Sequence, residues 1–133
     1  VAYKMFREKP IFGHGAKMFR ENCSDEKYAN NYGCSTHPHN MYLQLLSETG
    51  LVGAIPIFLI LLSISYVFCR QIYSQFFLKK PLYDDYIICL YVSLFITLWP
   101  LSPSLNIFNN WISIIYFMPV GFLLHSLKSN SQN

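Results

Sequence analysis

Hydrophobic residues are concentrated in three runs in the second part of the chain, and short polar segments separate these runs. The first run, 51–69, has 19 residues and no Asp, Glu, Lys or Arg. The other two, 86–101 and 111–127, have 16 and 17 residues and lie in a longer stretch that is also free of these charges. A helix needs about 20 apolar residues to cross a bilayer. The pattern therefore predicts three transmembrane helices, of which the last two are short and need close packing or little tilt.

The first 50 residues mix polar and apolar positions and predict short helices and loops. Residues 1–9 have the pattern of a helix end, which Pro10 stops, and Gly13 and Gly15 then favour turn conformations. Residues 22–38 are rich in polar and turn-forming side chains and predict a loop.

A short helix is predicted immediately before the first apolar run. Asn40 is a favourable N-cap, residues 41–49 are typical helix formers, and Gly50 is suited to the position just after a helix. We expect this helix to lie at the membrane interface, and Glu48 to cap or pair locally. The side chains expected to face inward are Leu43, Leu45 and Leu46.

Composition supports the membrane interpretation. Charged residues make up 13% of the chain and hydrophobic residues 53%, whereas soluble domains are about 25% charged. Intrinsic disorder is excluded, because it requires low hydrophobicity and high net charge. The net charge of +3 is too small and too scattered to indicate nucleic-acid binding. The chain is thus predicted to be an all-α integral membrane protein.

The basic residues predict which way the helices cross the membrane. The short loop 70–85 contains three of them, the tail 128–133 contains Lys128, and the loop 102–110 contains none. Because short cytoplasmic loops are enriched in Lys and Arg, loop 70–85 and the tail are predicted to be cytoplasmic. Residues 1–50 and 102–110 then lie on the outer face, where the two tryptophans flank the second of these segments as interfacial anchors.

We expect the chain to be the C-terminal part of a longer polytopic protein. It begins with Val1, and residues 1–10 lack the basic region and apolar segment of a signal peptide. A membrane protein must nevertheless be targeted, which suggests further spans before this segment.

Two cysteines in the outer segment allow three arrangements. Cys23 and Cys34 enclose ten residues, and in an oxidising compartment a disulfide between them would contribute about 2–3 kcal/mol. The competing arrangement is a zinc site that adds His37 and His39, although its spacing lacks the usual close cysteine pair. Two free thiols are the third. We prefer the disulfide.

His39 lies just before the predicted short helix. The positive end of the helix dipole disfavours a protonated imidazole there, and a neutral imidazole is what a general base requires. The same helix end attracts phosphate groups. On spacing alone, however, capping or interfacial roles for His37 and His39 are the more common outcome.

The segment 39–53 resembles the signature of the O-antigen ligase family and of the related lipid-linked polysaccharide polymerases, together the Wzy-C superfamily. It has a His-Asn pair, nine residues, Gly50, two residues and then Gly53. Residues 10–15 (PIFGHG) are similar to the family's Pro-x-x-Gly-x-Gly sequence at the start of the same periplasmic loop. The three predicted spans match the family's C-terminal end.

The resemblance implies a GT-C-like glycosyltransferase of the bacterial inner membrane. Its ligase members transfer a glycan from undecaprenyl diphosphate to a lipid A-core sugar, and its polymerase members extend a lipid-linked glycan. It implies that His39 deprotonates the acceptor hydroxyl and that no metal or other cofactor takes part. Residues 1–50 would then be the periplasmic catalytic-loop segment, 51–127 its three-span anchor and 128–133 a cytoplasmic tail, with the fragment alone inactive.

Further residues are candidates for substrate contacts. The family's diphosphate-binding arginines suggest Arg7 and Arg20 as local contributors, although neither aligns securely and both also fit solvated loop charges. His37 is a candidate for orienting the base or contacting phosphate, and Asn40 and Tyr42 for contacting sugar. The implied partners are the lipid-linked glycan, the lipid A-core acceptor and membrane lipid. Three asparagines either line the path of the acceptor or form a polar turn: Asn106, Asn109 and Asn110.

A function of a different class stays open at this point. A non-catalytic membrane protein whose Cys/His loop binds a metal or a protein partner would fit the same loop composition.

Overall fold

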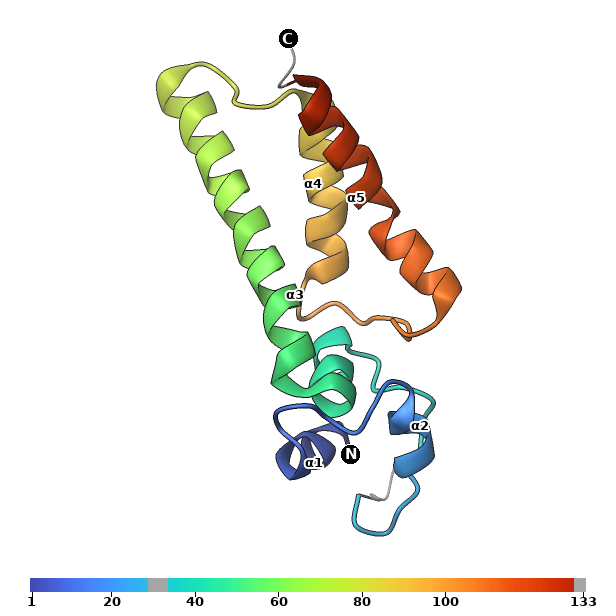
Figure 1. Ribbon diagram of the computed structural model, residues 1–133. Coiled ribbons are helices and arrows are strands. Elements are labelled where there is room, and N and C mark those ends of the chain that lie inside the picture. The colour runs from blue at the N-terminus through green and yellow to red at the C-terminus, as the bar shows by residue number, and fades with distance from the viewer. Residues whose placement is uncertain (29–33, 131–133) are drawn as a thin grey trace.

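The computed structural model describes residues 1–28 and 34–130, and the regular elements of this part are all helical (Figure 1). The elements are α1 (Ala2–Glu8), α2 (Met18–Asn22), α3 (Met41–Tyr73), the π-helical turn η1 (Ser74–Leu78), α4 (Asp85–Leu98) and α5 (Asn110–Asn130). The long helices α3, α4 and α5 lie next to one another, whereas α1 and α2 lie at the end where α3 begins (Figure 1). As predicted, α1 ends just before Pro10.

The surface of the long helices is largely apolar and exposed. On α5, Ile115 and Leu124 are each 63% exposed. A contiguous apolar surface of this kind is unfavourable in water and favourable in a bilayer. Two helical segments are long and apolar enough to cross a membrane: α3 with η1 (Met41–Leu78, 38 residues) and α5 (Asn110–Ser129, 20 residues).

The predicted second span is shorter than expected. Helix α4 has 14 residues and ends at Leu98, which gives a length of about 21 Å. Trp99 is extended (φ −65°, ψ 124°), as expected for a residue that precedes a proline. Pro100 therefore ends the helix before the predicted limit of residue 101. Among the described residues, two helices rather than three reach membrane-spanning length.

Apolar side chains from all three long helices form one core. Leu61 and Ile64 of α3, Ile87 and Leu94 of α4, and Leu123 of α5 are all buried in it. This core holds the membrane region together, while the opposite faces of the helices remain available to lipid.

Helix α3 is interrupted at Gly50, whose backbone is not helical (φ 63°, ψ −158°). The first nine residues, 41–49, therefore form a separate helical segment ahead of the long apolar one, as predicted. The expected inward face is only partly right. Leu45 is buried and Leu46 is partly buried, whereas Leu43 is 41% exposed, because Gln44 and Glu48 occupy the buried side of this segment.

Candidate functional site

The loop after α1 packs into the break in α3 and completes the helix end that precedes the break. The N–H of His14 donates to the carbonyl of Ser47 (3.1 Å), and the N–H of Gly15 donates to the carbonyl of Glu48 (2.8 Å). The last carbonyls of a helix have no hydrogen-bond donors within the helix. Here the N–H groups of the loop are their donors.

The same loop also caps the start of the long apolar helix that follows the break. The N–H of Leu51 donates to the carbonyl of Pro10 (2.9 Å), and the N–H of Val52 donates to the carbonyl of Ile11 (3.2 Å). The first N–H groups of a helix need such acceptors. One short loop thus caps both helix ends, so the break in α3 and the loop 10–15 form one structural unit.

Two glycines from the separate motifs meet in this unit. Gly13 and Gly50 both have positive φ, at 67° and 63°. A Cβ at Gly50 would overlap the backbone of Ile11, and a Cβ at Gly13 would overlap the backbone of Glu48. Backbone atoms cannot move away as a flexible side chain can, so glycine is required at both positions. Close backbone contact therefore explains why each of the two motifs has a glycine at this position.

Glu48 holds α2 against the first segment of α3. Its side chain is 1% exposed, and its carboxylate accepts from the backbone N–H groups of Lys17 (2.9 Å) and Phe19 (2.9 Å). These N–H groups lie at the start of α2, where helix donors lack partners. Glu48 was expected to cap or pair locally. It does cap a helix, but one that lies about 30 residues earlier in the chain.

Gln44 plays the corresponding role for the loop 102–110, which connects α4 and α5. Its side chain is 1% exposed; its amide nitrogen donates to Asn106 Oδ1 (2.7 Å), and its amide oxygen accepts from the N–H of Ile107 (3.3 Å). Gln44 is not among the residues that the sequence motifs mark as functional. The available signal was a pair of polar residues, Gln44 and Glu48, one helical turn apart in a segment otherwise rich in leucine.

Asn40 and Tyr42 also bind the connection between α4 and α5. Asn40 is the N-cap of α3, as predicted, because its Oδ1 accepts from the N–H of Leu43 (3.0 Å). The Nδ2 of Asn40 donates to the carbonyl of Pro100 (2.7 Å). The Tyr42 hydroxyl donates to the carbonyl of Leu98 (2.9 Å). The polar groups of both residues are therefore engaged within the protein.

The structure brings His37 and His39 together. Their ring centroids are 4.2 Å apart, with the planes inclined by 55°. His39 is exposed and has a positive φ of 55°, a conformation that costs energy for a non-glycine residue. Its carbonyl accepts from the N–H of Ser104 (3.0 Å), so the loop 102–110 fixes the backbone that presents this ring.

His37 is the buried member of the pair, with 9% of its surface exposed. Its Nδ1 lies 3.0 Å from the hydroxyl oxygen of Thr36, and its Nε2 has no partner within residues 1–28 and 34–130. Burial lowers the pKa of His37 below 6.5, and the neighbouring His39 lowers it further, while the backbone of Ser104 acts in the opposite direction. His37 therefore tends to stay neutral.

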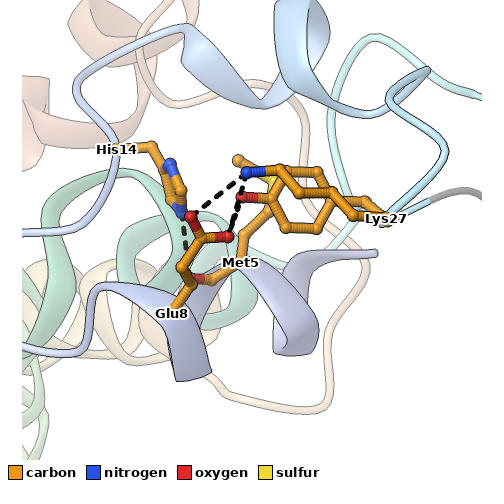
Figure 2. Close-up of polar contacts among 5 residues, drawn as sticks. Met5, Glu8, His14 and Lys27 are labelled. Atoms are coloured by element: carbon orange, nitrogen blue, oxygen red, sulfur yellow. Dashed lines mark hydrogen bonds and ion pairs between the residues drawn. The ribbon is translucent and has the colours of Figure 1, made fainter.

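A second polar cluster fixes α1 beside this region (Figure 2). His14 Nε2 donates to the carbonyl of Met5 (3.0 Å). Glu8 accepts from Lys27 Nζ (3.1 Å) and from the Tyr28 hydroxyl. Hydrogen bonds from Tyr28 and from Lys27 lower the pKa of Glu8. His14 is thus occupied in holding the loop 10–15 to α1.

The two candidate arginines lie on different helices. Arg7 is exposed in the last turn of α1. Arg20 is exposed in the last turn of α2 and lines an open pocket between α2 and the loop 102–110. The lining of this pocket does not include Arg7.

Cys23 and Cys34 are joined by a disulfide, with their Cα atoms 5.4 Å apart. The zinc alternative required thiolates from both cysteines together with His37 and His39. Within the described ranges, no group of three or more His, Cys, Asp or Glu side chains is placed to hold a metal ion.

The fold and this docked loop define an integral membrane protein in which an interrupted helix carries a pair of neighbouring histidines just before its first turn. The family model described as O-antigen ligase matches residues 1–77, which include α1, α2, α3 and most of η1. The chain therefore belongs to the O-antigen ligase family, whose members are glycosyltransferase-like enzymes of the membrane. Searches of curated proteins and of solved structures gave no significant match.

Proposed function

We propose that this chain provides the catalytic histidine segment of an O-antigen ligase-like glycosyltransferase. The reaction transfers a glycan from undecaprenyl diphosphate to a sugar of the lipid A core, at the periplasmic face of the inner membrane. The observation that carries this proposal is the exposed His39 ring, which the family motif presents beside a buried, neutral histidine.

His39 serves as the general base in this proposal. A ring nitrogen accepts the proton of the acceptor hydroxyl while the hydroxyl oxygen attacks the anomeric carbon of the donor sugar. The bond between that carbon and the lipid diphosphate breaks, and the diphosphate leaves with the electron pair, so the anomeric configuration is inverted. The reaction needs no metal ion to activate the leaving group, because a diphosphate is already a good one.

His37 supports this role through its charge state. A positively charged His37 at a ring distance of 4.2 Å would oppose the protonation of His39 during the reaction. Burial lowers the pKa of His37 and keeps it neutral, which removes this repulsion. His37 is therefore a positioning residue in the proposal, and His39 is the residue that contacts the acceptor.

The length of α3 supports the proposed orientation. From Leu51 to Arg70 the helix rises by about 28 Å, which is close to the thickness of the hydrocarbon core. The histidine pair and the basic loop 70–85 therefore lie at opposite ends of one span. Positive residues favour the cytoplasmic side, so the histidines face the periplasm.

Complementation of a ligase-deficient strain tests this function. Full-length protein should restore glycan-bearing lipopolysaccharide on gels, whereas His39→Ala should not, at equal membrane abundance. The matched control is His125→Ala, which alters an exposed histidine on α5 and should restore the glycan fully. Restoration by His39→Ala would refute the base assignment.

The lipid-linked intermediate separates ligase from polymerase activity. Deleting a ligase leaves long glycan chains on the lipid carrier, whereas deleting a polymerase leaves single repeat units. We expect long chains to accumulate, and single repeats would reassign the protein to polymer extension.

A further inference from the structure

An open pocket of about 450 Å³ lies between α2 and the loop 102–110 together with the start of α5. Lys17 and Arg20 line it on the α2 side with one carboxylate, Glu21. On the loop side its polar lining comes from asparagine side chains, and its aromatic lining includes Trp111. The asparagines are Asn106, Asn109 and Asn110.

Both walls of this pocket are fixed by buried side chains of the same helical segment. Glu48 holds the backbone of Lys17 and Phe19, and thereby the α2 wall. Gln44 holds Asn106 and Ile107, and thereby the loop wall. Residues four apart lie on one face of a helix, so Gln44 and Glu48 set the two walls relative to each other. The pocket is therefore preformed rather than a chance gap between mobile segments.

The lining matches a sugar that carries a negative charge. The carboxamide of Asn110 and the amide nitrogens of Asn106 and Asn109 can bond to sugar hydroxyls. The amide oxygens of Asn106 and Asn109 already accept hydrogen bonds within the protein. The indole of Trp111 is 78% exposed and offers a flat apolar surface to the C–H face of a pyranose. Two cations against one carboxylate leave a net positive charge, which favours a phosphate or carboxylate substituent. An acyl chain would displace water from the charged groups of Lys17, Arg20 and Glu21 without replacing its hydrogen bonds.

The pocket is connected to the histidine pair. Thr36 lines the pocket and its hydroxyl lies 3.0 Å from His37 Nδ1, while His37 packs against His39. We propose that this pocket binds the acceptor through a pyranose bearing an anionic group, and so brings the acceptor to the proposed base. This inference rests on the proposed function, because it says where the acceptor of that reaction binds.

Binding of glucose 6-phosphate to full-length protein in lipid nanodiscs, followed by saturation-transfer NMR, tests the proposal without any transfer reaction. We expect saturable binding. Arg20→Gln and Trp111→Ala should each weaken it roughly fivefold or more. The matched controls are Arg7→Gln, an exposed cation on α1, and Trp99→Phe, a tryptophan outside the pocket, and both should bind as wild type.

Three competitors identify what the pocket recognises. Glucose and inorganic phosphate should each displace glucose 6-phosphate poorly, because each lacks half of the recognised group. Farnesyl diphosphate, which represents the head of a lipid carrier, should also compete poorly. Absence of saturable binding, unchanged binding by Arg20→Gln and Trp111→Ala, or equal competition by any of the three would overturn the proposal.

One further variant separates this inference from the proposed function. His39→Gln should bind glucose 6-phosphate normally while losing glycan transfer. Normal transfer by His39→Gln would refute the assignment of His39 as the base without contradicting the binding pocket. Lost transfer by His39→Gln, together with unchanged binding by Arg20→Gln, would refute only the proposed binding pocket.

Discussion

The two halves of this protein are held together by different forces. Residues 51–129 pack through apolar side chains around Leu61, Ile87 and Leu94, and their outer faces remain apolar. Residues 1–50 have a small apolar cluster around Met5 and Phe19, and buried hydrogen bonds join their distant parts. Glu48 holds α2 in this way, while Gln44 joins this half to the loop 102–110. The first arrangement depends on apolar contacts, whereas the second also depends on a few buried polar groups and on close backbone contact. The site lies in the second region, where geometry is most narrowly defined.

The largest effect is expected where the backbones touch. Gly50→Val forces a β-branched residue to a φ of 63° and drives its Cβ into Ile11, so we expect a loss of about 3 kcal/mol or more in stability. The matched control is Gly121→Ala in α5, where a Cβ meets no atom within 4 Å. Thermal unfolding of the detergent-solubilised protein should show a large loss for the first variant and none for the second. Equal behaviour of the two would mean that the docked loop does not constrain the helix break.

The next largest effect concerns Glu48. Glu48→Ala leaves the N–H groups of Lys17 and Phe19 without acceptors, which should cost about 2–4 kcal/mol and release α2. Hydrogen exchange at these two amides should become much faster, while Glu26→Ala, at an exposed position, should change nothing. Unchanged protection in Glu48→Ala would show that α2 is held by other contacts.

A core substitution in the membrane half should cost less. Leu94→Ala removes a buried side chain, but lipid is as apolar as the core, so the packing contribution remains and the transfer contribution largely disappears. We expect a loss of about 1–2 kcal/mol in thermal unfolding. Leu124→Ala, at a position 63% exposed, should cost little. A loss for Leu94→Ala larger than that for Glu48→Ala would reverse the proposed ranking of the two halves.

The smallest effect is a pH dependence of the segment around His37. Its pKa is lowered in the folded protein, so between that pKa and 6.5 the unfolded state binds more protons. The folded segment therefore has its full stability above about pH 6.5, and it loses stability as the pH falls through the lowered pKa of His37. Protease cleavage near residues 34–40 should therefore accelerate at acidic pH, and His37→Gln should remove this acceleration. Acceleration that persists in His37→Gln would place the titrating group elsewhere.

The sequence predicted those features that depend on local pattern. Apolar runs predicted the membrane helices, Asn40 the start of α3 and Gly50 its interruption. The chain's membership of the family is confirmed, whereas the role of His39 that the motif implied stays a prediction. The length of α4 was overestimated, because apolar composition continues past Leu98 while Pro100 ends the helix.

The contacts that build the site were not predictable in the same way. Gln44 binds Asn106 across 62 residues, and Glu48 binds Lys17 across 31. Such pairs depend on which loops meet in the folded chain, and no local spacing specifies this. The docking of residues 10–15 into the helix break is of the same kind, although the glycines of both motifs marked its two sides.

The most direct test of the central claim is the rate of glycan transfer by purified full-length protein in proteoliposomes. Lipid-linked donor and lipid A-core acceptor are supplied, and His39→Gln is compared with His125→Gln in the same preparation. A general base contributes about 100-fold or more, so His39→Gln should be slower by at least that factor, while His125→Gln should match wild type. Transfer by His39→Gln at the wild-type rate would contradict the account.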